Sequence, residues 1–545
     1  MQKRIFFFVA ALLLSVGVFA QSDNNSALPN GDVNGDGVVD VADIAAVIGI
    51  MRNGGGVAKP PVVVQTGQTP IDNDTLLMQY HCMELFDEGV TRLDTVLINY
   101  MSDNTMPEGQ TFYLEGGKSY YIQDYVNITK GFTLETNPAD IAAGLPRAYV
   151  YMGVGYADTE ANPHTRQFML ARYANTAEED YVTLNIGDIV IRNVNFGPQR
   201  YYTYSDKYGS GGNSAANPTG NYFINCYSQT MAFSISKLEI SNCTFNGFVR
   251  GFIRFQGPRS EVIEELTVDN CVFYDCGDFD ANGRGYSWFA GSGNNNLANF
   301  YKNLNITNNT IIDCPRHALV SENRYLSWPS GTQWNILIEN NTFVNFSTKS
   351  SNASHGLLIE TQYAPSGSNI AVRKNLFVFT NKGYSDLRNL YMKGMRVDNQ
   401  SVSYDIRDNY STYIPAWGNF LASNNPNTTL VDGMFSARAF SDATYGAGFN
   451  NGSSNLGGMD QLRIKFGDNR NVNETDAVGY QLSADELFQD PQPLGAWRSS
   501  SDFDANMHRH NIDGFYYRRD ARVLQHPIVT QKIGDQRWAT GKAWK

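Results

Sequence analysis

Short alternations of apolar and polar residues dominate the chain, and one such phrase returns at intervals of about 30 residues. In each version, apolar residues occupy every second position up to a turn, and a second short run follows. Period-two alternation is typical of a strand with one buried face, so each phrase predicts two strands joined by a tight turn. The versions are IVIRNVNF (189–196), LEISNCTF (238–245), LTVDNCVF (266–273), LNITNNTI (304–311), ILIENNTF (336–343), IAVRKNLF (370–377) and YDIRDNYS (404–411).

Alignment of these phrases places one turn residue of each coil in a single column. The column contains Cys243, Cys271, Asn309, Asn341, Asn375 and Asn409. Parallel strands of successive coils lie about 4.8 Å apart, so equal positions stack and a buried asparagine can hydrogen-bond to the next one. The repeat therefore predicts an all-β fold, a right-handed parallel β-helix over residues 76–435. A β-sandwich is the alternative, but its strands would be separated by hairpin signals.

The six cysteines form no CxxC pair and no other spacing typical of zinc. Cys276 and Cys314 lie five positions after the first column and form a second one. We expect these cysteines to be small buried fillers of the stack, which is the commoner role of free buried cysteine. A disulfide between neighbouring coils is the alternative that the spacing leaves open.

Near the N-terminus, acidic and amide residues recur at every second position in GDVNGDGVVDVADIAAVIGIM (31–51). Hard divalent cations take six to eight oxygen ligands, and this spacing with a glycine at the sharp turn is that of a calcium loop. The predicted Ca2+ ligands are Asp32, Asn34, Asp36, the Val38 carbonyl, Asp40 and Asp43. Aspartate at the last ligand position resembles the dockerin repeat, so residues 31–53 are expected to form a small α module with a cohesin-like or cell-surface partner. Dockerins normally carry two repeats, and this chain has one complete copy.

The other segments predict an exported chain of several parts. Residues 1–20 combine two basic residues, an apolar run and a small-residue cleavage site, which indicates a signal peptide and a secreted or cell-surface protein. Residues 54–75 predict a linker, and residues 76–86 have the apolar spacing of a capping helix. Residues 436–545 are expected to be a C-terminal extension packed on or after the β-helix. No later stretch reaches the eighteen apolar residues that predict a membrane span.

The net charge of −12 disfavours nucleic acid as a partner, because polyanion binding needs a basic field. One column is nevertheless basic, since an arginine opens the strand after the turn in four coils. These residues are Arg250, Arg284, Arg316 and Arg388. Like charges at strand spacing repel one another unless acids or an anionic ligand compensate them. The column therefore predicts either ion pairs with nearby acids or a groove for acidic sugar. Tyr286 and Trp288 would stack on sugar rings if their side of the strand is exposed, and would be core residues if it is not.

The LxIxNCTF phrase resembles the pectate-lyase-like β-helix superfamily over residues 100–435. ELFQDP (486–491) and the late GDQRW (534–538) are similar to secreted or surface proteins of bacterial glycan-utilisation loci, where GDPRW is the usual ending. The resemblance implies that the chain handles an acidic, pectin-like polysaccharide.

Elimination from an acidic polysaccharide requires removal of the proton alpha to a uronate carboxylate by a basic residue. Arg284, Arg316 and His317 are the candidate catalytic residues, and the enzyme would then be a polysaccharide lyase. The strands show no paired aspartate motif for glycoside hydrolysis. The sequence thus predicts a secreted protein that acts on or binds acidic polysaccharide. A non-catalytic glycan-binding or adhesive surface protein is the alternative.

Overall fold

The structure is a computed structural model, and it describes part of the chain. The described residues are 61–64, 91–122, 124–152, 168–170, 184–198, 222–226, 233–246, 252–255, 261–274, 276, 288–290, 300–312, 319–321, 330–344, 346, 359–360, 364–378, 395–396, 402–411, 464–467, 482–491 and 512–541. The predicted signal peptide, the predicted calcium repeat and the helix expected at 76–86 lie outside these ranges. Within the predicted linker, the β-branched residues Val62–Val64 form strand β1.

The chain divides into two compact units, residues 1–62 with 110–112 and residues 63–109 with 113–545. Strands β1 and β3 (Gln110–Leu114) contain residues of both units. The described residues that belong wholly to the first unit are few, so the fold described below is that of the second unit.

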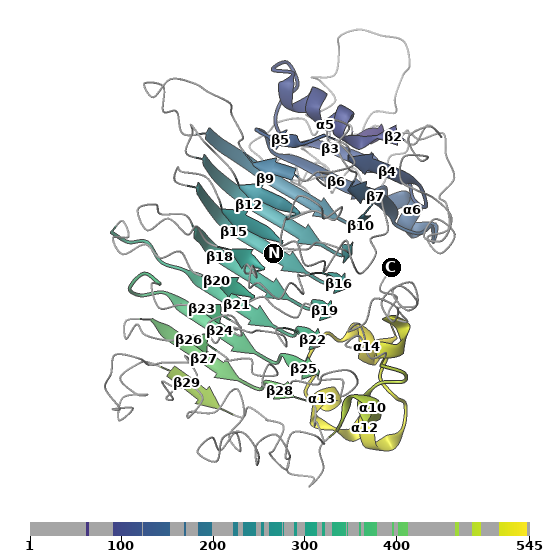
Figure 1. The fold of residues 1–545 in the computed structure, drawn as a ribbon, viewed down its shortest axis with the longest axis vertical. Coiled ribbons are helices and arrows are strands. Elements are labelled where there is room, and N and C mark those ends of the chain that lie inside the picture. The colour runs from purple at the N-terminus through teal and green to yellow at the C-terminus, as the bar shows by residue number, and fades with distance from the viewer. Residues whose placement is uncertain are drawn as a thin grey trace, which may run out of the picture. The chain divides into compact units, whose positions relative to one another are not determined.

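Three parallel sheets contain the described strands of this unit (Figure 1). From β6 onward, the first sheet has the order β6 (Phe132–Thr136), β9 (Leu184–Arg192), β12 (Phe233–Ser241), β15 (Glu261–Asp269), β18 (Phe300–Thr307), β21 (Asn335–Glu339), β24 (Asn369–Arg373), β27 (Ser403–Arg407) and β29 (Ile464–Gly467). The second sheet has the order β2 (Thr91–Arg92), β4 (Ser119–Ile122), β7 (Ala148–Met152), β10 (Val194–Pro198), β13 (Thr244–Asn246), β16 (Val272–Tyr274), β19 (Thr310–Ile312), β22 (Thr342–Val344), β25 (Leu376–Val378) and β28 (Tyr410–Ser411). The third has the order β5 (Val126–Ile128), β8 (Phe168–Leu170), β11 (Ile224–Cys226), β14 (Ile253–Phe255), β17 (Phe289–Ala290), β20 (Val320–Ser321), β23 (Ile359–Glu360) and β26 (Met395–Arg396).

Successive coils visit the three sheets in turn, so each strand pairs with the strand one coil away. From β12 the chain passes to β13 and β14 before β15 returns to the first sheet beside β12. The pairs along each sheet are parallel, as in β15 with β18, β16 with β19 and β14 with β17. The predicted all-β fold of stacked parallel coils is confirmed for the described residues.

A residue with left-handed backbone conformation turns each coil from the first sheet into the second. These residues have φ between 51° and 57° and are Asn193, Asn242, Asn270, Asn308, Asn340, Lys374 and Asp408. Asparagine and aspartate adopt this conformation more readily than most side chains, because their short polar groups can bond locally. The doubled asparagine of the phrases NNT (308–310 and 340–342) thus has two roles: the first residue makes the turn and the second points inward.

The inward asparagines form the predicted ladder. The Asn341 backbone N–H donates to Asn375 Oδ1 at 3.0 Å, and Asn341 Nδ2 donates to the same oxygen at 3.0 Å and to the Ile306 carbonyl at 2.8 Å. The pattern repeats along the column, whose fully buried members are Asn309, Asn341, Asn375 and Asn409. The four buried amides of this column are therefore hydrogen-bonded within the stack, which offsets the desolvation cost of a polar core residue.

Two of the cysteines, Cys243 and Cys271, occupy the earlier positions of the same stack. Cys226, Cys243, Cys271 and Cys276 are buried and form no disulfide, as the filler interpretation predicted for this class of residue. The Cys271 backbone N–H donates to Asn309 Oδ1 at 2.8 Å, so the thiol column continues directly into the amide column. Burial raises the pKa of the Cys271 thiol well above its usual value, which keeps the sulfur protonated and unreactive.

Two helices lie among the first described strands. Helix α5 (Leu93–Ser102) precedes the coils and buries Leu93, Leu97 and Tyr100, and the Tyr100 hydroxyl donates to the Gly131 carbonyl at 2.6 Å. A short helix, α6 (Pro138–Ala142), follows β6. No helix of the described residues is long and apolar enough to cross a membrane.

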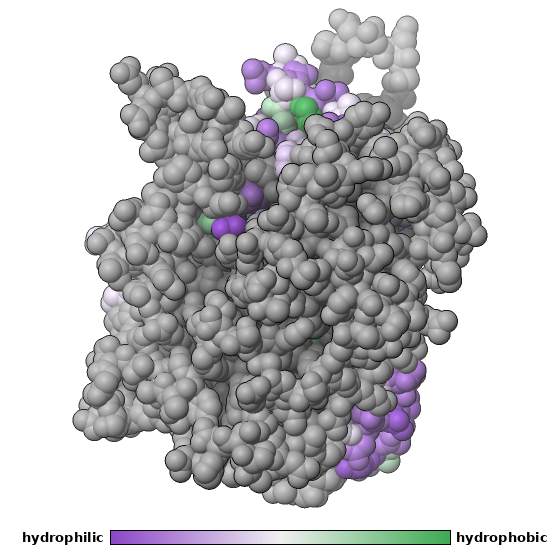
Figure 2. Space-filling view, in the orientation of Figure 1, coloured by the Kyte–Doolittle hydropathy of each residue, from purple (hydrophilic) through white to green (hydrophobic). Residues whose placement is uncertain are grey.

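The C-terminal segment, defined as residues 482–491 and 512–541, covers the outer face of the second sheet (Figure 1). Its elements are α10 (Ala484–Leu487), η6 (Ile512–Phe515), α12 (Ala521–Gln525), α13 (Pro527–Thr530) and α14 (Arg537–Thr540). Phe488 and Trp538 of this segment share one buried cluster with Ile312, Val344 and Val378 of the sheet. On the face drawn in Figure 2, the segment presents hydrophilic residues to solvent.

The GDQRW ending docks on the second sheet through buried polar contacts. Thr310 Oγ1 donates to Asp535 Oδ2 at 2.8 Å, and Trp538 Nε1 donates to the same hydroxyl at 2.7 Å. Asp535 forms a buried ion pair with Arg537 at 2.8 Å. Gly534 has φ of 77°, and a Cβ there would lie 2.8 Å from the Thr342 hydroxyl, so this position requires glycine.

Candidate functional site

Most residues predicted from sequence for the site lie outside the described residues. They are the calcium ligands Asp32 to Asp43, the arginines Arg250, Arg284, Arg316 and Arg388, and His317 and Tyr286. Their roles stay predictions. Among the residues that the structure describes, no group of three His, Cys, Asp or Glu side chains could hold a metal ion.

Trp288 is described, and its predicted role as a sugar-stacking surface is wrong. Its side chain is 0 % exposed and packs against Phe252 and Phe273, with ring centroids 6.1 and 5.5 Å away. Trp288 therefore continues the aromatic core between the second and third sheets. Alternation alone could not assign its side, because both parities of this strand carry aromatic residues.

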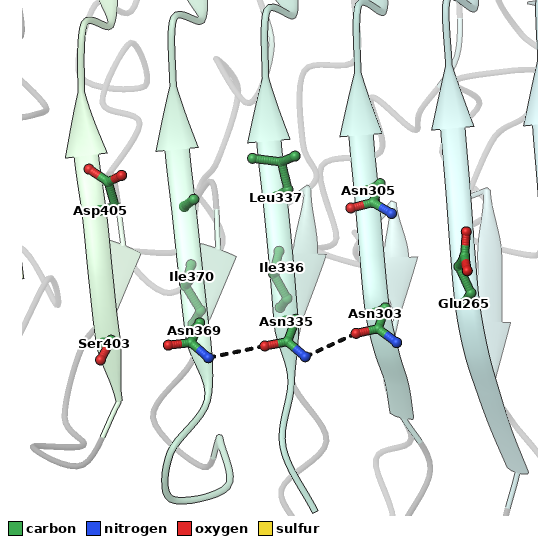
Figure 3. Close-up of a pocket in the computed structure, with 11 residues that line it drawn as sticks. Glu265, Asn303, Asn305, Asn335, Ile336, Leu337, Asn369, Ile370, Ser403 and Asp405 are labelled. Carbon is green, nitrogen blue, oxygen red and sulfur yellow. Dashed lines mark hydrogen bonds between the residues drawn. The ribbon is translucent and has the colours of Figure 1, made fainter. Parts of the chain in front are cut away.

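A groove of about 570 Å³ lies on the outer face of the first sheet. It crosses five successive strands, β15, β18, β21, β24 and β27 (Figure 3). Alternation along these strands explains its composition, because Ile336, Ile338 and Ile370 point into the coil and the residues between them point out.

An exposed amide column forms one side of the groove. Asn369 Nδ2 donates to Asn335 Oδ1 at 3.1 Å, and Asn335 Nδ2 donates to Asn303 Oδ1 at 2.9 Å (Figure 3). A primary amide has two N–H donors and two acceptor positions, so Asn335 keeps one of each for a ligand. Ser403 continues the column on the next strand, in register with Asn369.

The middle of the groove is a narrow apolar strip. Leu337 and Ala371 are in register on neighbouring strands, and both are half-buried. Asn305 precedes them in the same column and Asp405 follows them. A ligand in the groove would therefore meet amide groups along one edge and aliphatic carbon beneath it.

Charged residues border the groove at its two ends. Glu265 is exposed on β15, and Asp405 lies on β27. Asp405 interacts with two arginines, Arg373 Nη1 at 3.6 Å and Arg407 Nε at 3.1 Å. Arg373 Nε also lies 3.2 Å from Glu339 Oε1, so both stacked guanidinium groups are compensated by carboxylates.

Sequence reasoning missed the groove, although two signals for it are present. Asparagine stands directly before the repeated phrase in three successive coils, at Asn303, Asn335 and Asn369. Arginine closes the first strand in the phrases IAVRKNLF and YDIRDNYS, which places Arg373 beside Arg407. Both columns follow from the same alignment that revealed the buried ladder.

Comparisons of the chain with protein-family models, with curated proteins and with solved structures find no match in any of the three.

Proposed function

We propose that this protein binds a polysaccharide chain in the groove on its first sheet. The observation that carries the proposal is the outward Asn303, Asn335 and Asn369 column, of which Asn335 and Asn369 are exposed, beside the Leu337 and Ala371 strip. Sugars present hydroxyl groups at their edges and C–H groups on their faces, so they match amides beside an aliphatic surface. The amides also repeat with the coil, as the hydroxyls of a polymer repeat with its sugar units.

The dimensions of the groove favour binding over hydrolysis. Glu265 and Asp405 lie four strand spacings apart, which is about 19 Å at about 4.8 Å for each step. The two carboxyl groups of a glycosidase lie about 5–10 Å apart, so this pair cannot serve as acid and base on one bond. Elimination by Arg284, Arg316 and His317, and the acidic polysaccharide expected from the arginine column, stay predictions that the groove does not address.

The remaining expectations belong to the same proposal. A secreted or cell-surface location would bring the groove to extracellular glycan, and a calcium-loaded repeat at residues 31–53 would attach the protein to a partner. We also propose the right hand for the coils, because connections between parallel strands of one sheet are right-handed in about 98 % of cases.

Affinity electrophoresis of the full chain through gels that contain single polysaccharides tests the proposal. At least one polysaccharide should retard the wild type, and the double variant Asn335→Ala, Asn369→Ala should weaken the affinity at least about tenfold, the equivalent of about 1.4 kcal/mol. Asn185→Ala is the matched control, because Asn185 is also an exposed asparagine of the first sheet but lies outside the groove. Equal retardation of wild type and double variant would overturn the assignment to this groove.

A further inference from the structure

The charges around the groove select among polysaccharides. Of the described side chains that line it, Glu265 and Asp405 are the charged ones, and both are acidic. Between them lie the neutral amides Asn303, Asn335 and Asn369. The two carboxylates stand at opposite ends, so a chain that fills the groove meets one at each end (Figure 3).

The neighbouring arginines do not make the net charge around the groove positive. Asp405 pairs with both Arg373 and Arg407, and Glu339 also pairs with Arg373. Three carboxylates, Glu265, Glu339 and Asp405, therefore face two guanidinium groups, which leaves one net negative charge in this set. A guanidinium already bound to two carboxylates offers little attraction to a third.

We infer that the groove takes an uncharged polysaccharide and discriminates against a polyuronate. This inference rests on the proposed function and adds the class of ligand to it. A polyuronate carries a carboxylate on every sugar, so it meets repulsion from Glu265 at one end of the groove and little attraction from the charge-balanced group around Asp405 at the other. A neutral chain makes the same hydroxyl contacts without that repulsion. The groove is open to solvent, and salt should therefore weaken the discrimination, since the screening length is about 10 Å at 0.1 M.

The test uses pairs of polymers that share a backbone and differ in charge. Polygalacturonate is compared with its methyl-esterified form, and carboxymethyl cellulose with hydroxyethyl cellulose, by isothermal titration of the full chain at low and high salt. In any pair that binds, the neutral form should bind at least about fivefold more tightly at low salt, the equivalent of about 1 kcal/mol, and the gap should narrow at high salt.

Two variants sharpen the result. Glu265→Gln keeps the shape of an exposed side chain and should raise the affinity for the anionic form relative to the neutral form. Asp405→Asn also removes the shared partner of Arg373 and Arg407, so it should raise that ratio further. Tighter binding of the anionic form by wild type would overturn the inference and leave the proposed function intact. Binding of no polymer, including the wider panel used in the gels, would instead overturn the proposed function.

Discussion

The same coils present two outer faces with opposite composition. On the first sheet, the outward residues of β18, β21 and β24 include Asn303, Asn335 and Asn369, and they line an open groove. On the second sheet, the outward residues of β19, β22 and β25 include Ile312, Val344, Leu376 and Val378, and the C-terminal segment buries them. The outward residues of the two sheets can therefore differ in composition, because the stacked coils are held together by their inward residues and their buried ladder.

The covered face contributes to the free energy of folding, and the open face contributes to the free energy of binding. Burial of apolar side chains contributes about 25 cal/mol for each Å² removed from water, so the covered face stabilises the fold. The amides of the open face are already solvated, and their hydrogen bonds along the column contribute little. Substitutions on the two faces should consequently separate stability from ligand affinity.

The largest effect is expected from Trp538→Ala on the covered face. The side chain is fully buried against the second sheet, and its indole donates to Thr310, so the change should lower the free energy of unfolding by about 3–5 kcal/mol. Chemical denaturation measures the loss. Leu524→Ala is the control, since Leu524 of the same segment is 39 % exposed and its loss should cost less than about 0.5 kcal/mol. Equal effects of the two changes would show that the segment does not hold this face closed.

An intermediate effect is expected from Asn341→Ala in the turn that joins the two faces. This change removes the acceptor of the buried Asn309 backbone N–H and the donor to the Ile306 carbonyl, both in the preceding coil, at a cost of about 1–3 kcal/mol. Its neighbour Asn340 provides the control: at φ of 56°, Asn340→Gly suits the backbone and should change stability by less than about 0.5 kcal/mol. A loss at Asn340 as large as that at Asn341 would mean that the turn, and not the ladder, carries the stability.

The smallest effect on stability is expected from Asn335→Ala on the open face. Exposed substitutions away from buried features usually change the free energy of unfolding by less than about 0.5 kcal/mol, and Asn335 is such a residue. The same denaturation experiment measures it beside Asn341→Ala. A loss of more than about 1 kcal/mol in the free energy of unfolding would contradict this contrast, because the outer asparagine column would then stabilise the fold as the inner one does.

The repeated phrase was sufficient to predict the stacked coils and the ladder through Asn309 and Asn341, since both depend on residues at equal positions of successive coils. It was insufficient for Trp288, because a period of two says which residues share a face and not which face is inward. The arginine column from Arg250 to Arg388 stays a prediction because its residues lie outside the described ranges. To predict the groove, the alignment has to be extended by one position, to the asparagines that precede three successive phrases at 303, 335 and 369.

The sequence was sufficient to predict the parallel coil, its turns and its buried polar column. Each of these features recurs along the chain, and the spacing between parallel strands stacks the recurring positions. The tertiary structure alone decided which outer face is covered. That choice depends on contacts between Trp538 or Asp535 and Thr310, more than 200 residues apart in the chain, and no local pattern encodes them. The first sheet keeps its open face because the C-terminal segment packs against the second sheet instead.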